Sequence, residues 1–324
     1  MGKTIVVALG GNAILQAGER GTAAEQKRNI ENTVKQIVKL IKDNHRVIVT
    51  HGNGPQVGNL MIQQEAAKGK VPPMPLDVCG AQTQGQIGYM IQNSLENEFK
   101  RLGINKKAVT LITQVLVDKN DPAFANPTKP VGPFYTEEEA RRAMEEKSEI
   151  WIEDSGRGWR RVVPSPDPKG IVERDIIKSL VERDFVVIAS GGGGIPVIED
   201  ADGSLLGVEA VIDKDLAGEK LAHEVGADTF VILTDVPYVA INYGTPSQKN
   251  LEKVTLAEME DYKKQGHFRA GSMGPKVEAV CRFVRRGGKM AVIASLDKAV
   301  DAVYGKTGTV IVNNTDKQLI EKAG

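Results

Sequence analysis

Short runs of β-branched and other apolar residues alternate along the chain with longer segments in which apolar residues recur every three or four positions. The short runs that predict buried strands are residues 5–9, 46–50, 109–115, 185–189, 230–233 and 290–294. The segments that predict helices are residues 30–41, 87–102 and 171–181, and a helix that begins at Pro275 and stops at Gly287 and Gly288. This alternation is typical of an α/β fold with a parallel, doubly wound sheet covered by helices.

Residues 118–168 do not follow this alternation. They are crowded with proline, charged and turn residues, and they contain both tryptophans of the chain, Trp151 and Trp159. A segment of about fifty residues without core periodicity is too long for an ordinary connection in a compact domain. Two interpretations stay open: a surface excursion without a chemical role, or a lid that closes over a substrate, with Lys129 as its charged contact.

Composition limits the partners and the compartment. The chain has 324 residues, 41% of them hydrophobic, and 42 basic residues balance 42 acidic ones. This length allows one large α/β domain or two lobes, and the balanced charge argues against nucleic acid or a membrane surface as the main partner. The apolar runs are too short for a signal sequence or a membrane span. The cysteines, Cys79 and Cys281, do not build a disulfide framework, so we expect a cytoplasmic protein.

Glycine-rich turns follow three of the predicted strands. They are residues 10–12, 51–54 and 191–194, and a fourth glycine-bearing segment spans residues 271–276. Glycine at the end of a strand removes the Cβ that would keep a ligand away, so successive backbone N–H groups can converge on an anion such as phosphate. Three such turns in one chain favour a phosphate-binding site.

Three lysines stand out by their sequence context. Lys129 lies in the possible lid, Lys214 stands between two aspartates after an apolar run that predicts a strand, and Lys276 falls in the first turn of a predicted helix. Asp215 is placed to orient Lys214 by a charge-assisted hydrogen bond, although an ion pair that merely ends a strand fits the same residues. Phosphoryl transfer depends mostly on alignment and on neutralisation of charge, which such turns and lysines provide.

Several familiar sites are absent from the sequence. It has no G-x-x-x-x-G-K-[ST] segment and no G-x-G-x-x-G at the start of a helix, which argues against a P-loop NTPase and a Rossmann dinucleotide site. The histidines lack the spacing of metal ligands, and His51 beside a glycine is more typical of a strand end than of a general base. No cluster of carboxylates predicts a metal site. The glycine turns therefore belong to a different class of phosphate-binding protein.

Five segments, in order along nearly the whole chain, carry a resemblance to a known family. They are residues 10–13 (GGNA), 51–58 (HGNGPQVG), 129–134 (KPVGPF), 213–217 (DKDLA) and 271–277 (GSMGPKV). The glycine turns and the DKD segment resemble the amino acid kinase family in general. The uninterrupted octapeptide from His51 and the insertion that contains Lys129 are similar to the carbamate kinases within that family.

The resemblance implies a three-layer α/β/α fold around a mainly parallel twisted sheet, formed by residues 1–324, with residues 118–168 as an inserted lid subdomain. It implies that the N-terminal half binds the acceptor and the C-terminal half the nucleotide. The implied activity is reversible transfer between carbamoyl phosphate and ADP, which gives ATP and carbamate, and carbamate decomposes to ammonia and carbon dioxide. In similar proteins the usual direction is ATP formation in arginine or purine-derivative fermentation. A homodimer and a Mg²⁺ ion held mainly by the nucleotide phosphates are also expected.

The resemblance further implies roles for single residues. Lys214 and Lys276 would flank the phosphoryl group, Asp215 would organise these two lysines, and Lys129 would reach carbamoyl phosphate from the lid. The residues that would hold the phosphoryl group, the acceptor and the carbamoyl end are Gly10, Gly11, Asn12, Gly52, Asn53, Gly192 and Gly193. The residues that would border the nucleotide are Asp235, Val236, Tyr243, Met273 and Lys276. Tyr243 also fits a loop aromatic that shields the core.

We expect direct in-line transfer without a covalent intermediate or a general base, because carbamate is already an anionic nucleophile. Two alternatives stay open. One is another amino acid kinase, or a carbamoyl phosphate synthetase built on this fold, which would share the phosphate-binding parts and differ in acceptor or direction. The other is a non-catalytic sensor of carbamoyl phosphate or nucleotide. Lys214, Asp215 and Lys276 argue against the sensor, because a binding protein has less need of a charged clamp around the transition state.

Overall fold

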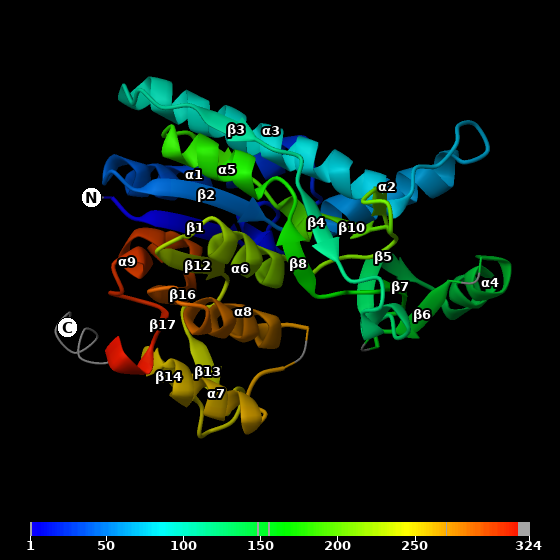
Figure 1. Ribbon diagram of the computed structural model, residues 1–324. Helices are drawn as coiled ribbons and strands as arrows, with labels where there is room; N and C mark the ends of the chain where they lie inside the picture. Colours follow the sequence, from blue (N-terminus) through cyan, green and yellow to red (C-terminus); the bar gives the residue numbers. More distant parts are fainter. Residues whose placement is uncertain (1, 148, 155, 270, 317–324) are drawn as a thin grey trace.

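A large, mostly parallel sheet forms the centre of the molecule (Figure 1). The computed structural model describes residues 2–316 except 148, 155 and 270. The sheet has eight strands in the order β15-β17-β16-β12-β1-β2-β9-β3. Their bounds are β1 (Thr4–Leu9), β2 (Arg46–His51), β3 (Ala108–Thr110), β9 (Val186–Ile188), β12 (Thr229–Thr234), β15 (Lys253–Thr255), β16 (Met290–Ser295) and β17 (Thr309–Val312). The pair β16–β17 is antiparallel, and the other neighbouring pairs are parallel.

The alternation of side chains along each strand explains the three layers. In β1, Ile5, Val7 and Leu9 belong to one buried cluster, whereas Val6 and Ala8 belong to the other, because successive side chains point to opposite faces of a sheet. The helices of the first cluster are α1 (Ala23–Lys42), α3 (Leu76–Leu102) and α9 (Ala299–Val303). Those of the second are α5 (Arg174–Glu182), α6 (Lys214–Glu224) and α8 (Met273–Arg285). The predicted α/β fold with a mainly parallel sheet and helices on both faces is confirmed.

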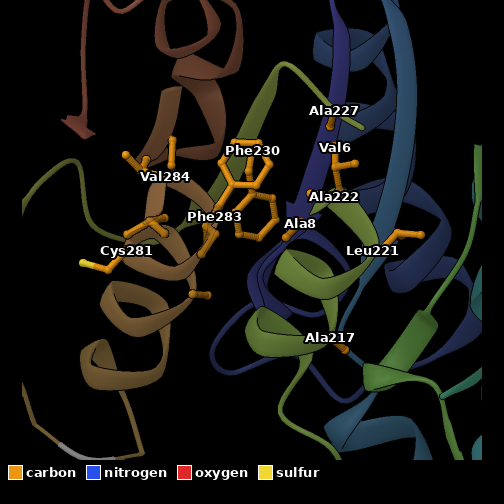
Figure 2. Close-up of a cluster of buried hydrophobic side chains, with 14 of the residues drawn as sticks. Val6, Ala8, Ala217, Leu221, Ala222, Ala227, Phe230, Cys281, Phe283 and Val284 are labelled. Carbon is orange, nitrogen blue, oxygen red and sulfur yellow. The ribbon is translucent and has the colours of Figure 1, made fainter. Parts of the chain in front are cut away.

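Helices α6 and α8 pack on the sheet through aromatic side chains (Figure 2). The rings of Phe230 in β12 and Phe283 in α8 lie 5.8 Å apart, centroid to centroid, at a tilt of 52°. Gly218 lets α6 pack close to strand β12, because a Cβ at this position would lie 3.3 Å from the Phe230 ring. Both helices are thereby fixed against the same strands, and both carry residues of the candidate site.

The prediction of one strand over residues 109–115 is wrong. This segment forms two strands, β3 in the large sheet and β4 (Gln114–Val117) in a second sheet of order β11-β10-β4-β8. The buried Gln84 side chain holds the turn between them: its Oε1 accepts the N–H of Thr113 at 2.7 Å and its Nε2 donates to the Thr113 carbonyl at 3.1 Å. The chain therefore leaves one sheet and enters the other within three residues.

The second sheet also corrects a helix boundary. Its remaining strands are β8 (Pro168–Ile171), β10 (Ile195–Glu199) and β11 (Leu205–Gly207). The helix predicted over residues 171–181 begins at Arg174, and Ile171 belongs to β8. Ile171 shares the buried cluster with α5, so its apolar character matched the helical spacing. A two-stranded sheet, β13 (Val239–Ile241) with β14 (Lys249–Leu251), and helix α7 (Leu256–Lys264) complete the C-terminal part.

The segment that breaks the alternation has a small sheet of its own. Its antiparallel order is β5-β7-β6, with β5 (Lys129–Tyr135), β6 (Ile150–Glu153), β7 (Trp159–Val163) and helix α4 (Glu137–Lys147). It projects from one end of the molecule (Figure 1). Val131 and Val163 pack it against α2 (Gly54–Ala67) and the start of α3.

Two negative findings hold within the described residues. None of the helices there is long and apolar enough to cross a membrane. Both cysteines are buried and free, so they form no disulfide with each other.

Candidate functional site

The glycine turns meet along one edge of the large sheet. Strands β12, β1, β2 and β9 are consecutive neighbours and all parallel, so their carboxyl ends lie side by side. The chain that leaves these ends contains Asp235, Gly10, Gly52 and Gly191, in that order across the sheet. Gly10 donates its N–H to the Leu233 carbonyl at 2.8 Å, and a Cβ at Gly10 would lie 2.8 Å from the same oxygen. Only glycine permits this approach.

The turn after β9 is the most tightly folded of these turns. Gly192, Gly193 and Gly194 all have positive φ values, of 68°, 96° and 84°, which side chains rarely tolerate. A Cβ on Gly192 would collide with the amide of Asn53, whose Nδ2 donates to Thr83 Oγ1 at 2.8 Å. A Cβ on Gly193 would collide with the Ile212 carbonyl oxygen. Gly192 thus faces the turn after β2, while Gly193 packs on the chain that leads into α6.

His51 supports the turns as a neutral residue. Burial lowers its pKa to about 4, and the nearby Lys214 charge acts in the same direction. Its Nδ1 lies 2.9 Å from the Gly52 carbonyl oxygen and donates to it. The His51 ring is buried and neutral, and its Nδ1–H is already hydrogen-bonded to a backbone oxygen. Both features fit the interpretation of His51 as a strand-end residue.

Helix α6 brings a lysine and an aspartate to the same edge. Asp213 caps the helix: its Oδ1 accepts the N–H groups of Asp215 at 2.9 Å and Leu216 at 3.4 Å. Lys214 is therefore the first residue of a helix, and the prediction that it follows a strand is wrong. The apolar residues 211–212 pack in buried clusters, and they are not paired in a sheet.

Asp215 lies between two lysines. Its Oδ1 is 2.6 Å from Lys214 Nζ, and its Oδ2 is 3.2 Å from Lys276 Nζ. The Asp215 side chain is only 3% exposed. Burial raises its pKa, but the two ammonium groups outweigh burial and hold the pKa below the usual value. Asp215 is consequently a permanent anion that fixes two cations on adjacent helices.

Lys276 comes from the N-terminal turn of α8. This helix begins at Met273, two residues before the predicted start at Pro275. Pro275 has no backbone N–H, but N–H groups in the first turn of a helix have no acceptor within the helix, so proline is tolerated there. The ammonium group of Lys276 lies where the positive end of the helix dipole also points, which favours an anion there.

Lys129 reaches the site from the insertion. It is the first residue of β5, and its Nζ lies 2.9 Å from Asp213 Oδ2. Its partner caps the helix that carries Lys214 and Asp215, and these two residues line the same cavity as Lys129.

Three adjoining cavities surround these charges. The central cavity, of about 320 Å³, lies between the insertion and the sheet edge, and its lining includes Gly11, Gly52, Asn53, Lys129, Gly192, Lys214, Asp215 and Lys276. A smaller one, of about 210 Å³, is lined by residues that include Gly10, Gly11, Asn12, Lys214, Asp235 and Lys276. The third, of about 400 Å³, is bordered by residues that include Asp235, Val236, Tyr243, Met273 and Lys276. Lys276 lines all three.

Tyr243 is 62% exposed and forms part of the wall of the third cavity. A residue so exposed does not shield the core, which removes that interpretation. The five residues predicted to border a nucleotide thus share one cavity, and it adjoins the cavity of the lysines through Lys276.

Two lining residues escaped sequence analysis as functional candidates. Arg160 of β7 lines the central cavity, with its Nε 3.2 Å from the Gly132 carbonyl oxygen. Asp213 lines the same cavity and caps α6. An aspartate just before a helical segment is a recognisable N-cap signal, so Asp213 was accessible from sequence. Arg160 had no comparable signal, because its position depends on the pairing of β5 with β7.

Comparisons with known proteins agree with this geometry. A sequence profile of the amino acid kinase family matches residues 3–295. The carbamate kinases of Thermococcus kodakarensis and Pyrococcus furiosus are 61% and 58% identical, each over 96% of this chain and over 99% and 100% of the relative. The structure of the carbamate kinase from Giardia lamblia bound to AMP-PNP superposes with a TM-score of 0.92 at 50% identity, covering 97% of this chain and 99% of that one. The chain therefore belongs to the amino acid kinase family, and within it to the carbamate kinases.

Proposed function

We propose that this protein catalyses reversible phosphoryl transfer between carbamoyl phosphate and ADP in the cytoplasm. The observation that carries the proposal is Asp215 holding Lys214 and Lys276 where the three cavities meet. Phosphoryl transfer requires positive charge that is fixed in advance around the transferring oxygens. Two ammonium groups tied to one buried carboxylate meet that requirement without rearrangement.

In the ATP-forming direction, a β-phosphate oxygen of ADP attacks the phosphorus of carbamoyl phosphate. The P–O bond to the carbamoyl oxygen breaks, and carbamate leaves with that electron pair and then decomposes to ammonia and carbon dioxide. No proton must be removed from the nucleophile in either direction, so no general base is needed. His51 is neutral, and its Nδ1–H donates a hydrogen bond to a carbonyl oxygen, which is consistent with such a mechanism.

The substrates are assigned to the cavities by their chemistry. Carbamoyl phosphate would occupy the central cavity, against Gly11, Gly52, Asn53 and Gly192, with Lys129 contacting it from the insertion. ADP would lie in the third cavity, with its phosphates directed toward Lys276. This arrangement gives the N-terminal half the acceptor and the C-terminal half the nucleotide. The AMP-PNP in the Giardia lamblia relative supports a nucleotide site in this fold.

Mg²⁺ is the proposed metal, held mainly by nucleotide phosphates. No group of three or more His, Cys, Asp or Glu residues that could hold a metal occurs among the described residues. Asp235 lines both the small cavity and the third one, where phosphates would pass. One carboxylate with phosphate oxygens and water suits Mg²⁺, which rarely uses an all-protein cage. The metal would neutralise phosphate charge, while Lys214 and Lys276 hold the transferring group.

The insertion is proposed to act as a lid. Trp151 packs edge-on against Tyr135 at 5.1 Å between ring centroids, and its Nε1 donates to Glu149 at 3.1 Å. If the insertion moves when ligands bind, this environment should change. We expect tryptophan emission to shift on saturation with ADP and carbamoyl phosphate together. Unchanged emission would favour a surface insertion that does not move when ligands bind.

A homodimer is proposed from the family alone. Exposed apolar side chains such as Tyr89 in α3 and Ile176 in α5, at 66% and 56% exposure, are compatible with a covered surface. Light scattering after size-exclusion chromatography would give the molar mass directly, and a value near the 35.0 kDa of one chain would contradict a dimer.

ATP formation tests the proposed activity. Purified protein is assayed with ADP, Mg²⁺ and carbamoyl phosphate, with acetyl phosphate and acetylglutamyl phosphate as competing donors. Lys276→Ala should lower turnover about 10²-fold or more. The matched control is Lys289→Ala, which removes an exposed lysine paired with Asp228. Turnover with another acyl phosphate alone would indicate a different amino acid kinase, and binding without turnover would indicate a sensor.

A further inference from the structure

Asp213 uses both of its carboxylate oxygens, and each oxygen serves a different part of the molecule. Oδ1 accepts the first N–H groups of α6, while Oδ2 lies 2.9 Å from Lys129 Nζ in the insertion. One side chain thus joins the helix that carries Lys214 and Asp215 to the lysine that enters from the other side of the central cavity.

The backbone of the insertion is held in place by other contacts. Val131 and Val163 are buried against α2 and α3. A Cβ on Gly58 would lie 3.4 Å from the Gly132 Cα, so α2 and β5 approach backbone to backbone. Lys147 of α4 is 3.0 Å from Glu65 of α2. The contact with Asp213 is therefore not needed to place β5.

The contact instead sets the direction of the Lys129 side chain. A lysine carries its charge on a flexible four-carbon stem, so the ammonium group has no fixed place without a partner. The Lys129 side chain is 32% exposed and that of Asp213 is 14% exposed, so the partner is the more firmly held of the two. The helix N–H groups bound to Oδ1 restrict the Asp213 carboxylate further.

We propose that Asp213 is a positioning residue, which aims Lys129 at the anionic end of the acyl phosphate in the central cavity. The proposal rests on the function proposed above. An ammonium group has three N–H donors: one donates to Asp213, and the others remain for oxygens of the dianionic phosphate. Asp213 touches no reacting atom and acts through Lys129, in the way that Asp215 acts through Lys214 and Lys276.

Asp213→Asn separates this role from helix capping. Asparagine is as good an N-cap as aspartate, so α6 should keep its first turn. The asparagine oxygen takes the capping position of Oδ1, and its NH2 group takes the place of Oδ2, so Lys129 loses both its acceptor and the opposite charge. We expect the KM for carbamoyl phosphate to rise roughly tenfold. We expect kcat and the KM for ADP to change less than threefold, and thermal unfolding should stay near that of the unchanged protein.

A double substitution tests whether the effect passes through Lys129. In a Lys129→Ala background, Asp213→Asn should raise the KM for carbamoyl phosphate no further. The matched control is Lys147→Ala, which breaks the ion pair of the insertion with α2 and should leave this KM unchanged. An equal rise in Lys147→Ala would mean that any loosening of the insertion weakens binding, and would overturn the proposal.

Other outcomes also overturn it. An unchanged KM in Asp213→Asn would leave capping as the role of this residue, and a lower KM would mean that its carboxylate competes with phosphate for Lys129. If the unchanged protein does not turn over carbamoyl phosphate, the proposed function fails separately. The affinity for inorganic phosphate, measured by calorimetric titration, is then compared instead of KM. Asp213→Asn should weaken phosphate binding when Lys129 is present and have no effect in the Lys129→Ala background.

Discussion

Asp215 and Glu219 lie one turn apart on helix α6, and both are buried, but their pKa values are shifted in opposite directions. Burial raises the pKa of each. For Asp215, the ammonium groups of Lys214 and Lys276 outweigh burial and lower the pKa. For Glu219, burial dominates over the Arg286 and Arg282 charges and raises the pKa to about 7. Burial alone therefore does not determine which carboxylate keeps its charge.

The difference lies in the cations. Each oxygen of Asp215 has its own lysine, at 2.6 and 3.2 Å. Glu219 shares a single nitrogen, Nη1 of Arg286, which lies 3.1 and 3.0 Å from its two oxygens, and the Arg286 side chain is 35% exposed. The first turn of α6 thus holds a carboxylate that stays charged between two lysines, whereas the second holds a titratable group that joins α6 to the end of α8.

Asp215→Asn should produce the largest effect. It removes the charge that holds the ammonium groups of Lys214 and Lys276 in place. We therefore expect turnover to fall about 10²- to 10³-fold, the scale for a preorganised electrostatic group. Steady-state ATP formation measures this loss, and circular dichroism checks the fold. Glu219→Gln is the matched control, one turn away, and should stay within a few-fold of full activity. Equal losses in both variants would remove the distinction between the two turns.

Glu219→Gln should change how stability depends on pH. The pKa of Glu219 in the folded state lies above the ordinary glutamate value of 4.5, so between pH 4.5 and about 7 the folded state binds more protons than the unfolded state. Its contribution to stability is therefore full below pH 4.5 and falls as pH rises to about 7, by up to about 3 kcal/mol. Urea unfolding at pH 5 and pH 8 should show a smaller decline for the variant than for the unchanged protein. Parallel declines would contradict the raised pKa.

Arg286→Met removes the cation of the second turn and keeps a long apolar side chain. Glu219 is then buried without its partner and takes up a proton more readily. We expect a loss of about 2 kcal/mol at pH 8, less than the 3–5 kcal/mol of a fully buried pair because Arg286 is partly exposed. The loss should shrink at pH 5, where Glu219 is mostly protonated in the folded state with or without Arg286. A loss independent of pH would assign it to packing alone.

The smallest effect is expected at Cys281, a third titratable group of the same layer. Burial raises its pKa to about 12, and the Glu260 carboxylate acts in the same direction. The thiolate is the reactive form of cysteine, so a chromogenic disulfide reagent at pH 8 should leave Cys281 unmodified and activity unchanged in the native protein. Unfolding in urea should expose both Cys79 and Cys281 to the reagent. Rapid native labelling of Cys281 would show that α8 opens more easily than its packing suggests.

The sequence predicted the central strands and the long helices well because their patterns are local. Strand β1 and helix α1 need only alternation or a 3.6-residue period to be recognised, and each glycine turn marks a strand end. The segment over residues 109–115 was misassigned because an apolar run does not reveal which sheet each half joins. That choice depends on Gln84, about thirty residues earlier in the chain.

The candidate site was predicted in part. The glycine turns were predicted at strand ends, and the parallel order of β12, β1, β2 and β9 brings them to one edge. Lys214 and Asp215 of the DKD segment line the same cavity as these turns. The contact between Lys129 and Asp213 joins residues 84 positions apart. Arg160 enters the central cavity through the pairing of β5 and β7. Such contacts depend on tertiary structure, which no local pattern encodes.

The buried side chain of Gln84 has a consequence for how the protein unfolds. Besides both backbone contacts with Thr113, its Nε2 donates to the Gly191 carbonyl at 3.1 Å. A single amide therefore links the crossing between the two sheets to the third glycine turn. Because a buried amide left without partners is costly, we expect the small sheet and the central strands to lose their hydrogen-exchange protection together, as one cooperative unit.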